Sequence, residues 1–448
     1  MYTLVMSIAI IWWWAAGLMC AATLLESGYS EDIFLFDKNP HLGAKVIISG
    51  GGRCNVTTSF YKKEILKTKY PRGRNFIEPA ITAFWPKKIY KRFSDHGVQL
   101  KIEKDGRVFP ISNNGKDVVG VFETLFAWYD NLKLCLGERI ISISKKIWIF
   151  DHVDRVRSLD SANSIWFQGS ARDDAVVDEG QCAFVIVSDK CQYLVDNVVI
   201  TTWWNAYRHT WSTGDGYAFA QDLWHSITKL GPSLNSFESD CAWMKELSWL
   251  AFPESQIISH DNQKFDGPLL LTHFGISGPM VFAYSAHVAF EWCEKKQPLL
   301  VKRKPIWSRS FDDRMSYLQE QMSNNPKKQI DSLLKQFFPL RFVQAFLFSI
   351  GMGGAWIMNT LNKHHLRVIA KELWEGIEIV LIARRAWDEF VTAGGVSTDE
   401  VDPLTMESKL CPGLYFAGEI MNVDGVTWWY NLTSSRAGGY VLWNHLSK

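Results

Sequence analysis

The N-terminal residues show two buried-strand patterns separated by a helical pattern. An apolar, β-branched run from Leu4 to Ile11 precedes an alanine- and leucine-rich segment, Ala15 to Leu25. A second apolar run, Ile33 to Phe36, follows, and Asp37 closes it. Short apolar runs favour buried strands, and the Ala/Leu segment favours a helix. Strand, turn, helix, strand and acid within about 35 residues predict the opening βαβ unit of a dinucleotide-binding domain.

The same segment resembles a membrane-spanning helix in its composition. The first 25 residues of the chain carry no charge, and a membrane span needs about 20 apolar residues. However, no Lys or Arg precedes the apolar run, as a signal peptide requires, and no basic cluster follows it to set an orientation. We therefore expect a buried strand and helix, and no membrane partner.

The rest of the chain divides into three stretches. Residues 76–130 read mainly as helices, and 131–200 as short strands that end in a parallel-type run, Asn197 to Thr201. Residues 205–375 combine strand patterns with a lysine-bearing helical region, and we interpret them as an inserted domain. A strand pattern returns at 377–382, and a last helix is expected from about residue 432.

This organisation predicts an α/β fold. Residues 1–204 and 376–448 form a discontinuous Rossmann-like domain, and residues 205–375 form an inserted β-rich and helical domain.

Charge and cysteine content exclude several classes of function. The 48 basic and 47 acidic residues nearly balance, so nothing global indicates a nucleic acid or an anionic membrane, although a local basic patch stays open. The eight cysteines are scattered without a CxxC pair, so we predict neither a metal site nor a disulfide framework. A reducing cytoplasm is the simplest location.

Tryptophan is unusually frequent. The chain has 21, including the runs Trp12-Trp13-Trp14, Trp203-Trp204 and Trp428-Trp429. Trp is bulky and needs a partner for its N–H when buried, so these runs require a local explanation.

Several ordered motifs resemble the BaiN/RdsA-like (YhiN-type) NAD(P)/FAD-dependent oxidoreductases over almost the full length. The matching stretches are AAGLMCA (15–21), LGAKVIISGGGRCNVT (42–57), DGRVFPISNNGKDVV (105–119), STGDGYAFA (212–220), THFGISGP (272–279), VTAGGVSTDEVDP (391–403), MESKL (406–410) and GLYFAGEI (413–420).

The resemblance implies an FAD-binding domain of the two-dinucleotide-binding flavoprotein type, built from both ends of the chain, with the insert as substrate or cap domain. It also implies hydride transfer from NAD(P)H through the flavin to a substrate, with reduction of a carbon–carbon double bond proposed for some members. The substrate stays open between a small molecule, such as a steroid-like enone, and an RNA base. The protein's part is to position the flavin and tune its electronics.

The resemblance also implies cofactor residues, each with a plainer structural alternative. Asp37, with Lys38 beside it, stands where the family's acid binds the adenosine ribose; a solvated strand-end acid is the alternative. Gly51, Gly52, Arg53 and Asn55 belong to a glycine-rich loop that can face a pyrophosphate or the flavin edge, or form a structural turn.

Cys54, within that loop, is expected to be a small buried thiol, because no second cysteine is adjacent. Gly418 and Glu419 match the family's late motif at the ribityl chain, with a simple strand-end turn as the alternative. Gly17, Gly425 and Asn431 complete the expected cofactor contacts. No catalytic residue is identified; His273 is a weak proton-donor candidate, and a core histidine is equally compatible with the sequence.

The sequence departs from the family pattern at glycines. The family opens with G-x-G-x-x-G, but here residues 12–17 are Trp-Trp-Trp-Ala-Ala-Gly. The first glycine makes the tight turn and the second admits the pyrophosphate. Tryptophan also replaces glycine at further positions, and Asn422 stands where Asp is usual. These positions are Trp12, Trp14, Trp203, Trp204, Trp428 and Trp429 at cofactor turns, and Trp211, Trp224, Trp249 and Trp443 elsewhere.

Three hypotheses follow. The first is an oxidoreductase scaffold whose FAD site is blocked, so that FAD binding and activity are impaired or lost. The second is a flavin-dependent reductase that stays active because its turns have rearranged around the indoles. The third is a non-enzymatic binding or membrane-associated protein. Overpacking costs of about 1 to 3 kcal/mol per site also make misfolding a possible outcome.

Overall fold

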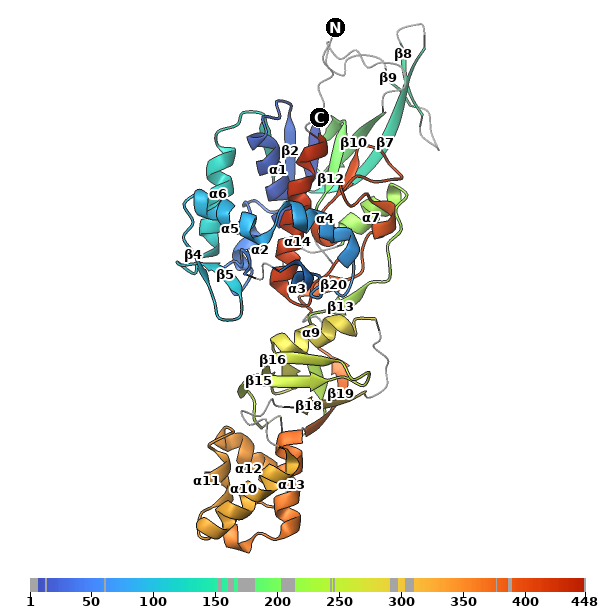
Figure 1. Ribbon diagram of the computed structural model, residues 1–448. Coiled ribbons are helices and arrows are strands. Elements are labelled where there is room, and N and C mark those ends of the chain that lie inside the picture. The colour runs from blue at the N-terminus through green and yellow to red at the C-terminus, as the bar shows by residue number, and fades with distance from the viewer. Residues whose placement is uncertain are drawn as a thin grey trace. The chain divides into compact units, whose positions relative to one another are not determined.

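The chain forms two compact units, residues 1–231 with 391–448 and residues 232–390. In the computed structural model (Figure 1), the described residues are 7–12, 14–59, 62–151, 155–159, 165–167, 182–202, 214–241, 244, 246–290, 297–302, 310–375, 377–385 and 389–446. We call the two units the discontinuous unit and the inserted unit.

A five-stranded parallel sheet is the centre of the discontinuous unit. Ile8 on β1 lies opposite Asn197 on one neighbouring strand and Ile33 on the other, and the helix α1 (Ala15–Glu26) joins β1 to β2. The predicted βαβ unit and the predicted parallel strand from Asn197 are both confirmed. In spatial order the strands are β21 (Leu414–Phe416), β12 (Asn197–Ile200), β1 (Ile8–Ile11), β2 (Ile33–Asp37) and β6 (Leu132–Leu136).

The helix α14 (Trp428–Val441) packs against α1, so the two ends of the chain share one core (Figure 1). The approach is close: a Cβ at Gly439 would overlap the carbonyl oxygen of Ala16. The sequence pattern places the start of this helix near residue 432, whereas it begins at Trp428. Trp428 and Trp429 therefore lie in a first helical turn and not in a loop before the helix.

Smaller elements complete the discontinuous unit. A second, antiparallel sheet contains β7 (Ile140–Asp151), β8 (Arg155–Leu159), β9 (Ile165–Phe167), β10 (Cys182–Ser188) and β11 (Gln192–Val195), and a third contains β3 (Thr57–Thr58), β4 (Leu100–Ile102) and β5 (Arg107–Pro110). The remaining elements are α2 (Ala44–Ile48), α3 (Lys63–Lys67), α4 (Arg74–Ala83), α5 (Pro86–Asp95), α6 (Gly115–Phe126), α7 (Asp215–Asp222), α15 (Trp443–Leu446), β20 (Val391–Ala393) and the short helices η3 (Thr398–Glu400) and η4 (Gly418–Ile420).

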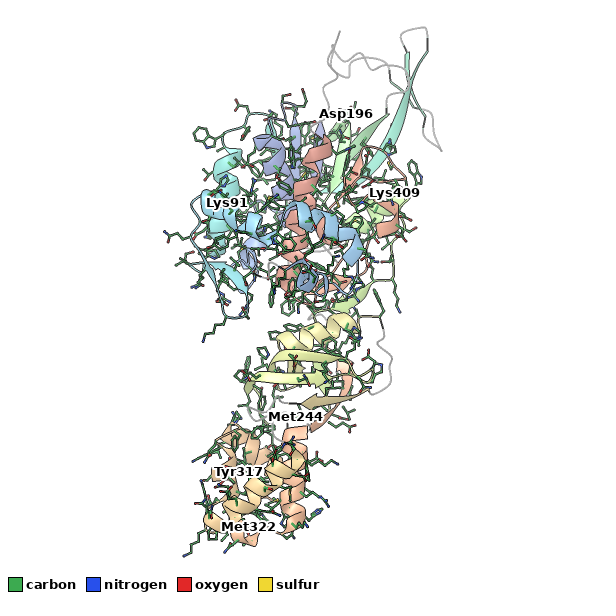
Figure 2. All side chains as sticks on the ribbon, viewed as in Figure 1. Lys91, Asp196, Met244, Tyr317, Met322 and Lys409 are labelled. Carbon is green, nitrogen blue, oxygen red and sulfur yellow. The ribbon has the colours of Figure 1, made fainter. Side chains whose placement is uncertain are left out.

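The inserted unit contains a closed six-stranded barrel and a group of helices. Buried apolar residues from both parts form one hydrophobic cluster, which includes Met244 and Leu318; Tyr317 and Met322 pack against it (Figure 2). The barrel strands are, in order, β14 (Phe237–Ser239), β17 (Gly275–Ser277), β16 (Lys264–Leu271), β15 (Ala251–Ile258), β18 (Gln297–Lys302) and β19 (Ile377–Arg384). The other elements are β13 (Gly231–Ser233), which begins at the boundary, α9 (Pro279–His287), α10 (Phe311–Asn324), α11 (Ile330–Leu334), α12 (Leu340–Ser349), η2 (Met358–Thr360) and α13 (Lys363–Glu375).

The unit boundaries lie later in the chain than the sequence pattern places them. The predicted insert is 205–375, whereas the compact unit is 232–390. The strand pattern at 377–382 was assigned to the C-terminal part of the Rossmann-like domain. In the structure, β19 pairs with β18 and β14 and so closes the barrel of the inserted unit. Strand pattern alone does not show which sheet a strand joins, because both sheets accept the same apolar residues.

None of the helices within the described residues is long and apolar enough to cross a membrane. The apolar N-terminal segment instead supplies β1 and α1, whose residues from Ala15 to Leu25 are all buried.

Candidate cofactor site after the first strand

The turn between β1 and α1 begins with Trp12. Its backbone has φ +65°, a left-handed conformation that glycine favours. The N–H of Trp12 donates to the carbonyl oxygen of Phe36 at 3.0 Å, and the Thr201 hydroxyl donates to the Trp12 carbonyl oxygen. A Cβ at Gly17 would lie 2.7 Å from both the Trp12 carbonyl oxygen and Thr201 Oγ1. The backbone of this turn therefore has the left-handed conformation and the close packing that suit glycine, although the residue there carries an indole side chain.

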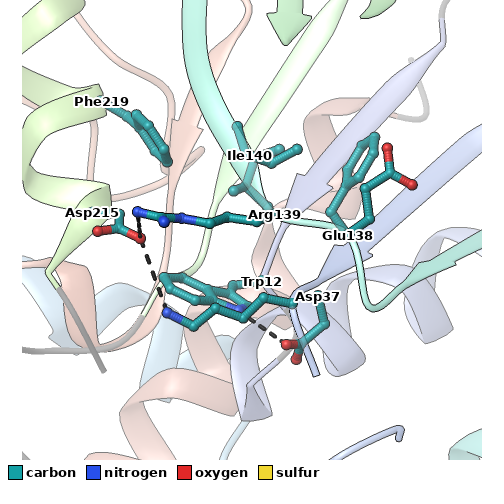
Figure 3. A pocket seen from close by; sticks show the side chains of 10 residues that line it. Trp12, Asp37, Glu138, Arg139, Ile140, Asp215 and Phe219 are labelled. Carbon is teal, nitrogen blue, oxygen red and sulfur yellow. Dashed lines mark hydrogen bonds and ion pairs between the residues drawn. The ribbon is translucent and has the colours of Figure 1, made fainter. Parts of the chain in front are cut away.

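The Trp12 indole is bound by the acid that was predicted to bind ribose. Its Nε1–H donates to Asp37 Oδ1 at 3.0 Å, and the backbone and side-chain N–H groups of Asn39 donate to the same oxygen at 2.7 Å each. Figure 3 shows the Trp12 ring close to the Arg139 side chain. The Lys38 ammonium lies 4.1 Å from the centroid of this ring. Asp37 and Lys38 both contact the indole, which occupies the space beside them.

Little volume is left in this pocket. The free cavity is about 20 Å³, which is enough for roughly one water molecule. Asp215 Oδ2 lies 4.0 Å from Lys38 Nζ and 3.8 Å from Arg139 Nη2 on its rim. Burial lowers the pKa of Lys38, and the Asp215 carboxylate acts in the opposite direction. A nucleoside does not fit in this volume. The lining residues are Ile11, Trp12, Phe36, Asp37, Lys38, Glu138, Arg139, Ile140, Asp215 and Phe219.

Two more of the replaced glycine positions meet at the start of α1. Trp14 is the N-cap residue of this helix and is 5% exposed. Its ring lies edge-on to that of Trp428, with centroids 6.2 Å apart. A helix N-terminus offers free N–H groups and a positive dipole end to a phosphate. Indoles from opposite ends of the sequence therefore gather where the family's pyrophosphate is expected.

The glycine-rich loop, for which a cofactor contact and a structural turn were both open, forms a turn. Gly51 and Gly52 have φ +72° and +87°. The Arg53 guanidinium, however, pairs with Glu103 at 2.7 Å and stacks 3.9 Å from the centroid of the Phe109 ring. Arg53 is thus held by the protein's own side chains, which favours the structural interpretation of this residue.

The end of that loop lies beside α14. Arg436 is 1% exposed and donates to the carbonyl oxygens of Asn55 and Val56. Cys54 is fully buried, and burial raises the pKa of its thiol, as expected for a small structural cysteine. The sequence analysis did not identify Arg436. The sequence does contain a signal that could have identified Arg436, because it is the single cation in an otherwise uncharged helix.

The residues of the C-terminal motif mainly contact other parts of the protein. Gly418 has φ +82°, and a Cβ there would lie 2.9 Å from that of Ala16. Glu419 is buried. Asn431 accepts from the N–H of Gly425 at 2.9 Å and donates to the Thr427 carbonyl oxygen at 3.1 Å. Asn431 and Gly425 therefore stabilise the start of α14 by contacting each other.

The other candidates do not join this site. His273 is exposed in the inserted unit, with its ring 5.1 Å from that of Phe274, so it is not the buried core histidine that was one alternative. Trp203, Trp204 and Trp211 lie outside the described residues.

The residues present only partly fit FAD. The amide oxygen and nitrogen of Asn55 and the hydroxyl of Thr202 are buried without a hydrogen-bond partner among the described residues. Buried polar groups of this kind usually have a partner, which a ligand can supply. Against this, Trp12 fills the space beside Asp37, and Trp14 with Trp428 covers the start of α1. The buried polar groups are therefore compatible with a bound dinucleotide, whereas the indoles occupy the space that a dinucleotide needs.

Comparison with known proteins identifies the scaffold. The chain is 25% identical to the 3-dehydro-bile acid delta(4,6)-reductase of Clostridium scindens, over 97% of each chain. It is 23% identical to the ribosomal RNA dihydrouridine synthase of Haemophilus influenzae, over 95% of this chain and 94% of that one. Among solved structures, a 3-ketosteroid delta1-dehydrogenase from Sterolibacterium denitrificans aligns with a TM-score of 0.42 at 10% identity, over 98% of this chain and 99% of that one.

The profile of the HI0933-like protein Rossmann domain matches residues 6–165 and 156–443, which together span nearly the whole chain. The predicted resemblance to BaiN/RdsA-like proteins is confirmed by these relatives, and an FAD-dependent oxidoreductase scaffold is indicated. The chain therefore belongs to the HI0933-like Rossmann-domain family.

Proposed function

We propose that this scaffold serves an FAD-dependent reductase, and that the chain with the residues written here binds FAD little or not at all. One observation carries the proposal: the Trp12 indole donates its N–H to Asp37 at 3.0 Å. That carboxylate is the group expected to receive the adenosine ribose. An internal side chain that already holds this hydrogen bond, inside a cavity of about 20 Å³, excludes the ligand.

The conformation of the turn supports a blocked site over a rearranged one. Trp12 retains φ +65°, and Gly17 retains its close contact with the Trp12 carbonyl oxygen. A turn that had rearranged around its indole would have moved to a conformation that Trp favours. The turn has a backbone conformation that suits glycine, which supports the proposal that the side chain fills the space that the cofactor needs.

For the substrate we propose a carbon–carbon double bond conjugated to a carbonyl group. The names of the two relatives describe a reductase of 3-dehydro bile acids and a synthase of dihydrouridine. An enone and a uracil ring share this conjugated unit, and both are reduced by adding a hydride and a proton. NAD(P)H is the proposed source of the hydride, and FAD supplies the carrier chemistry when bound. The cytoplasm is the proposed location.

Purification with excess FAD, followed by gel filtration and a visible spectrum, tests the proposal. We expect a colourless protein with helical circular dichroism, and the Haemophilus influenzae relative, treated identically, serves as the control for the procedure. A folded, yellow protein with one flavin per chain would refute the blocked site. Recovery in the membrane fraction would instead favour the non-enzymatic, membrane-associated alternative.

A further inference from the structure

Within the described residues, eight non-glycine residues have the left-handed backbone conformation that glycine favours, and three of them are tryptophans. Trp12, Trp224 and Trp249 have φ +65°, +69° and +69°. In this region the Cβ of an ordinary residue comes too close to the neighbouring carbonyl oxygen, and a bulky side chain there is a genuine outlier. Asn tolerates this conformation because its side chain can bond locally, whereas an indole has no such compensation. The three sites therefore share a backbone requirement.

Trp224 occupies the glycine position of a helix-terminating motif. The helix α7 ends at Asp222 with Leu223 as its C-cap. The N–H of Trp224 donates to the carbonyl oxygen of Gln221 at 3.0 Å, and that of His225 donates to Ala220 at 2.9 Å. These two bonds define a Schellman motif, whose left-handed residue is usually glycine.

The same motif occurs three more times in the part of the chain that the structure describes, each time with glycine. The helices α1, α5 and α12 end with the same pair of backbone hydrogen bonds. Their left-handed residues are Gly28, Gly97 and Gly351, with φ +83°, +86° and +80°. Among these four described motifs, Trp224 is the exception, because the other three have glycine at the left-handed position.

Trp249 shows that the pattern does not follow the cofactor site. It lies in the inserted unit, in the turn before β15, and its side chain is 81% exposed. Its N–H donates to the carbonyl oxygen of Leu271 at 2.9 Å. Trp249 is not among the residues that line the pocket beside Asp37. Trp12, Trp224 and Trp249 share a left-handed backbone conformation, and they do not share a functional site.

Trp14, Trp428 and Trp429 belong to the same group through the family's glycine pattern. They stand at helix starts where the resemblance places glycine, and the Trp14 and Trp428 rings contact one another edge-on there. If each tryptophan had been selected separately, each would need its own reason. The positions differ too much to share one, because some are buried and others exposed, and some lie near the cofactor site and others outside it. One change in how a codon is decoded produces all of them together.

We propose that positions 12, 14, 224, 249, 428 and 429 are glycine in the protein that the source cell makes. The standard code has one tryptophan codon, UGG; the neighbouring codon UGA is a stop in that code and a sense codon in others. A cell that reads UGA as glycine makes a chain with glycine at each of these positions, and a reading of UGA as tryptophan gives the sequence written here. The site beside Asp37 then loses the indoles that fill it.

Peptide masses from the source cell test this without any flavin. Trypsin releases residues 209–229, which contain Trp224, and residues 246–264, which contain Trp249 as their only tryptophan. We expect fragment spectra that place glycine at 224 and 249, with UGA codons at all six positions in the gene. Tryptophan in either spectrum, or UGG at these positions, would overturn the proposal. Because neither readout depends on FAD, its failure is distinguishable from failure of the proposed function.

Discussion

Replacing Trp224 with glycine should stabilise the discontinuous unit, although it removes a large aromatic side chain. Relief of the left-handed conformation contributes roughly 1 to 2 kcal/mol, and the greater freedom of glycine in the unfolded chain costs about 0.4 to 1 kcal/mol. The indole is 65% exposed, so little packing is lost. The net gain is therefore between about 0 and 1.6 kcal/mol. Its central value of about 0.8 kcal/mol corresponds to a rise of roughly 1 to 3 °C in the unfolding midpoint of a unit of this size.

Two control variants isolate the backbone effect. Trp224→Ala removes the same indole and keeps a Cβ at the left-handed position, so it should be less stable than Trp224→Gly. Trp128 is 80% exposed at the end of α6 and is absent from the left-handed residues. Trp128→Gly should therefore lower stability, by about 0.4 to 1 kcal/mol, because only the unfolded-chain cost remains.

Thermal and urea unfolding followed by far-ultraviolet circular dichroism provide the comparison, because tryptophan fluorescence changes with the substitutions themselves. The expected order of midpoints, from highest to lowest, is Trp224→Gly, the unsubstituted tryptophan chain and Trp128→Gly. If Trp224→Gly unfolds at or below the midpoint of Trp224→Ala, the argument from backbone conformation is wrong.

Further predictions concern the cofactor site and two buried groups. The combined variant Trp12→Gly, Trp14→Gly, Trp428→Gly and Trp429→Gly should retain FAD through gel filtration, whereas Trp224→Gly with Trp249→Gly should stay colourless; equal flavin content in the two would contradict the blocked site. In the four-glycine background, Asp37→Asn should weaken FAD binding about tenfold or more, measured by titration calorimetry, because a charged acceptor is lost; unchanged affinity would remove Asp37 from the site. Arg436→Met should cost about 3 kcal/mol, measured by urea unfolding, because the carbonyl oxygens of Asn55 and Val56 lose their buried donor; a loss below about 1 kcal/mol would show that these bonds matter little. Burial lowers the pKa of His225 from 6.5, so its contribution to stability is complete above that pH and declines below it as the unfolded chain takes up a proton; the unfolding midpoint of His225→Gln should vary less between about pH 7.5 and 5.5, and an identical pH profile would exclude this role.

The elements with strong local patterns were predictable from sequence. β1, α1 and β2 follow from apolar runs and an Ala/Leu segment, and the parallel strand at Asn197 follows from a continuous apolar run. β19 shows the limit: its pattern identifies a strand, but its pairing with β14 and β18 in the barrel is decided by tertiary contacts. The start of α14 was also missed, because tryptophan gives no capping signal.

The sequence motifs identify the candidate residues of the site, but they do not show which side chains contact one another. The motif places Asp37 and Lys38 at the end of β2, and both contact the Trp12 indole. The engagement of Arg53 by Glu103 and the burial of Arg436 depend on segments far apart in sequence. Local patterns carry no information on such partners.

The joining of the two chain ends has a consequence for the order of events during synthesis. The inserted unit is complete once residue 390 has left the ribosome, because all strands of its barrel lie before that point. The discontinuous unit still lacks β21 and α14, which pair with β12 and pack against α1. Domains generally fold as units. The first half of the Rossmann-like sheet must therefore wait while the barrel folds, with one edge of β12 lacking its partner β21 until translation is almost finished.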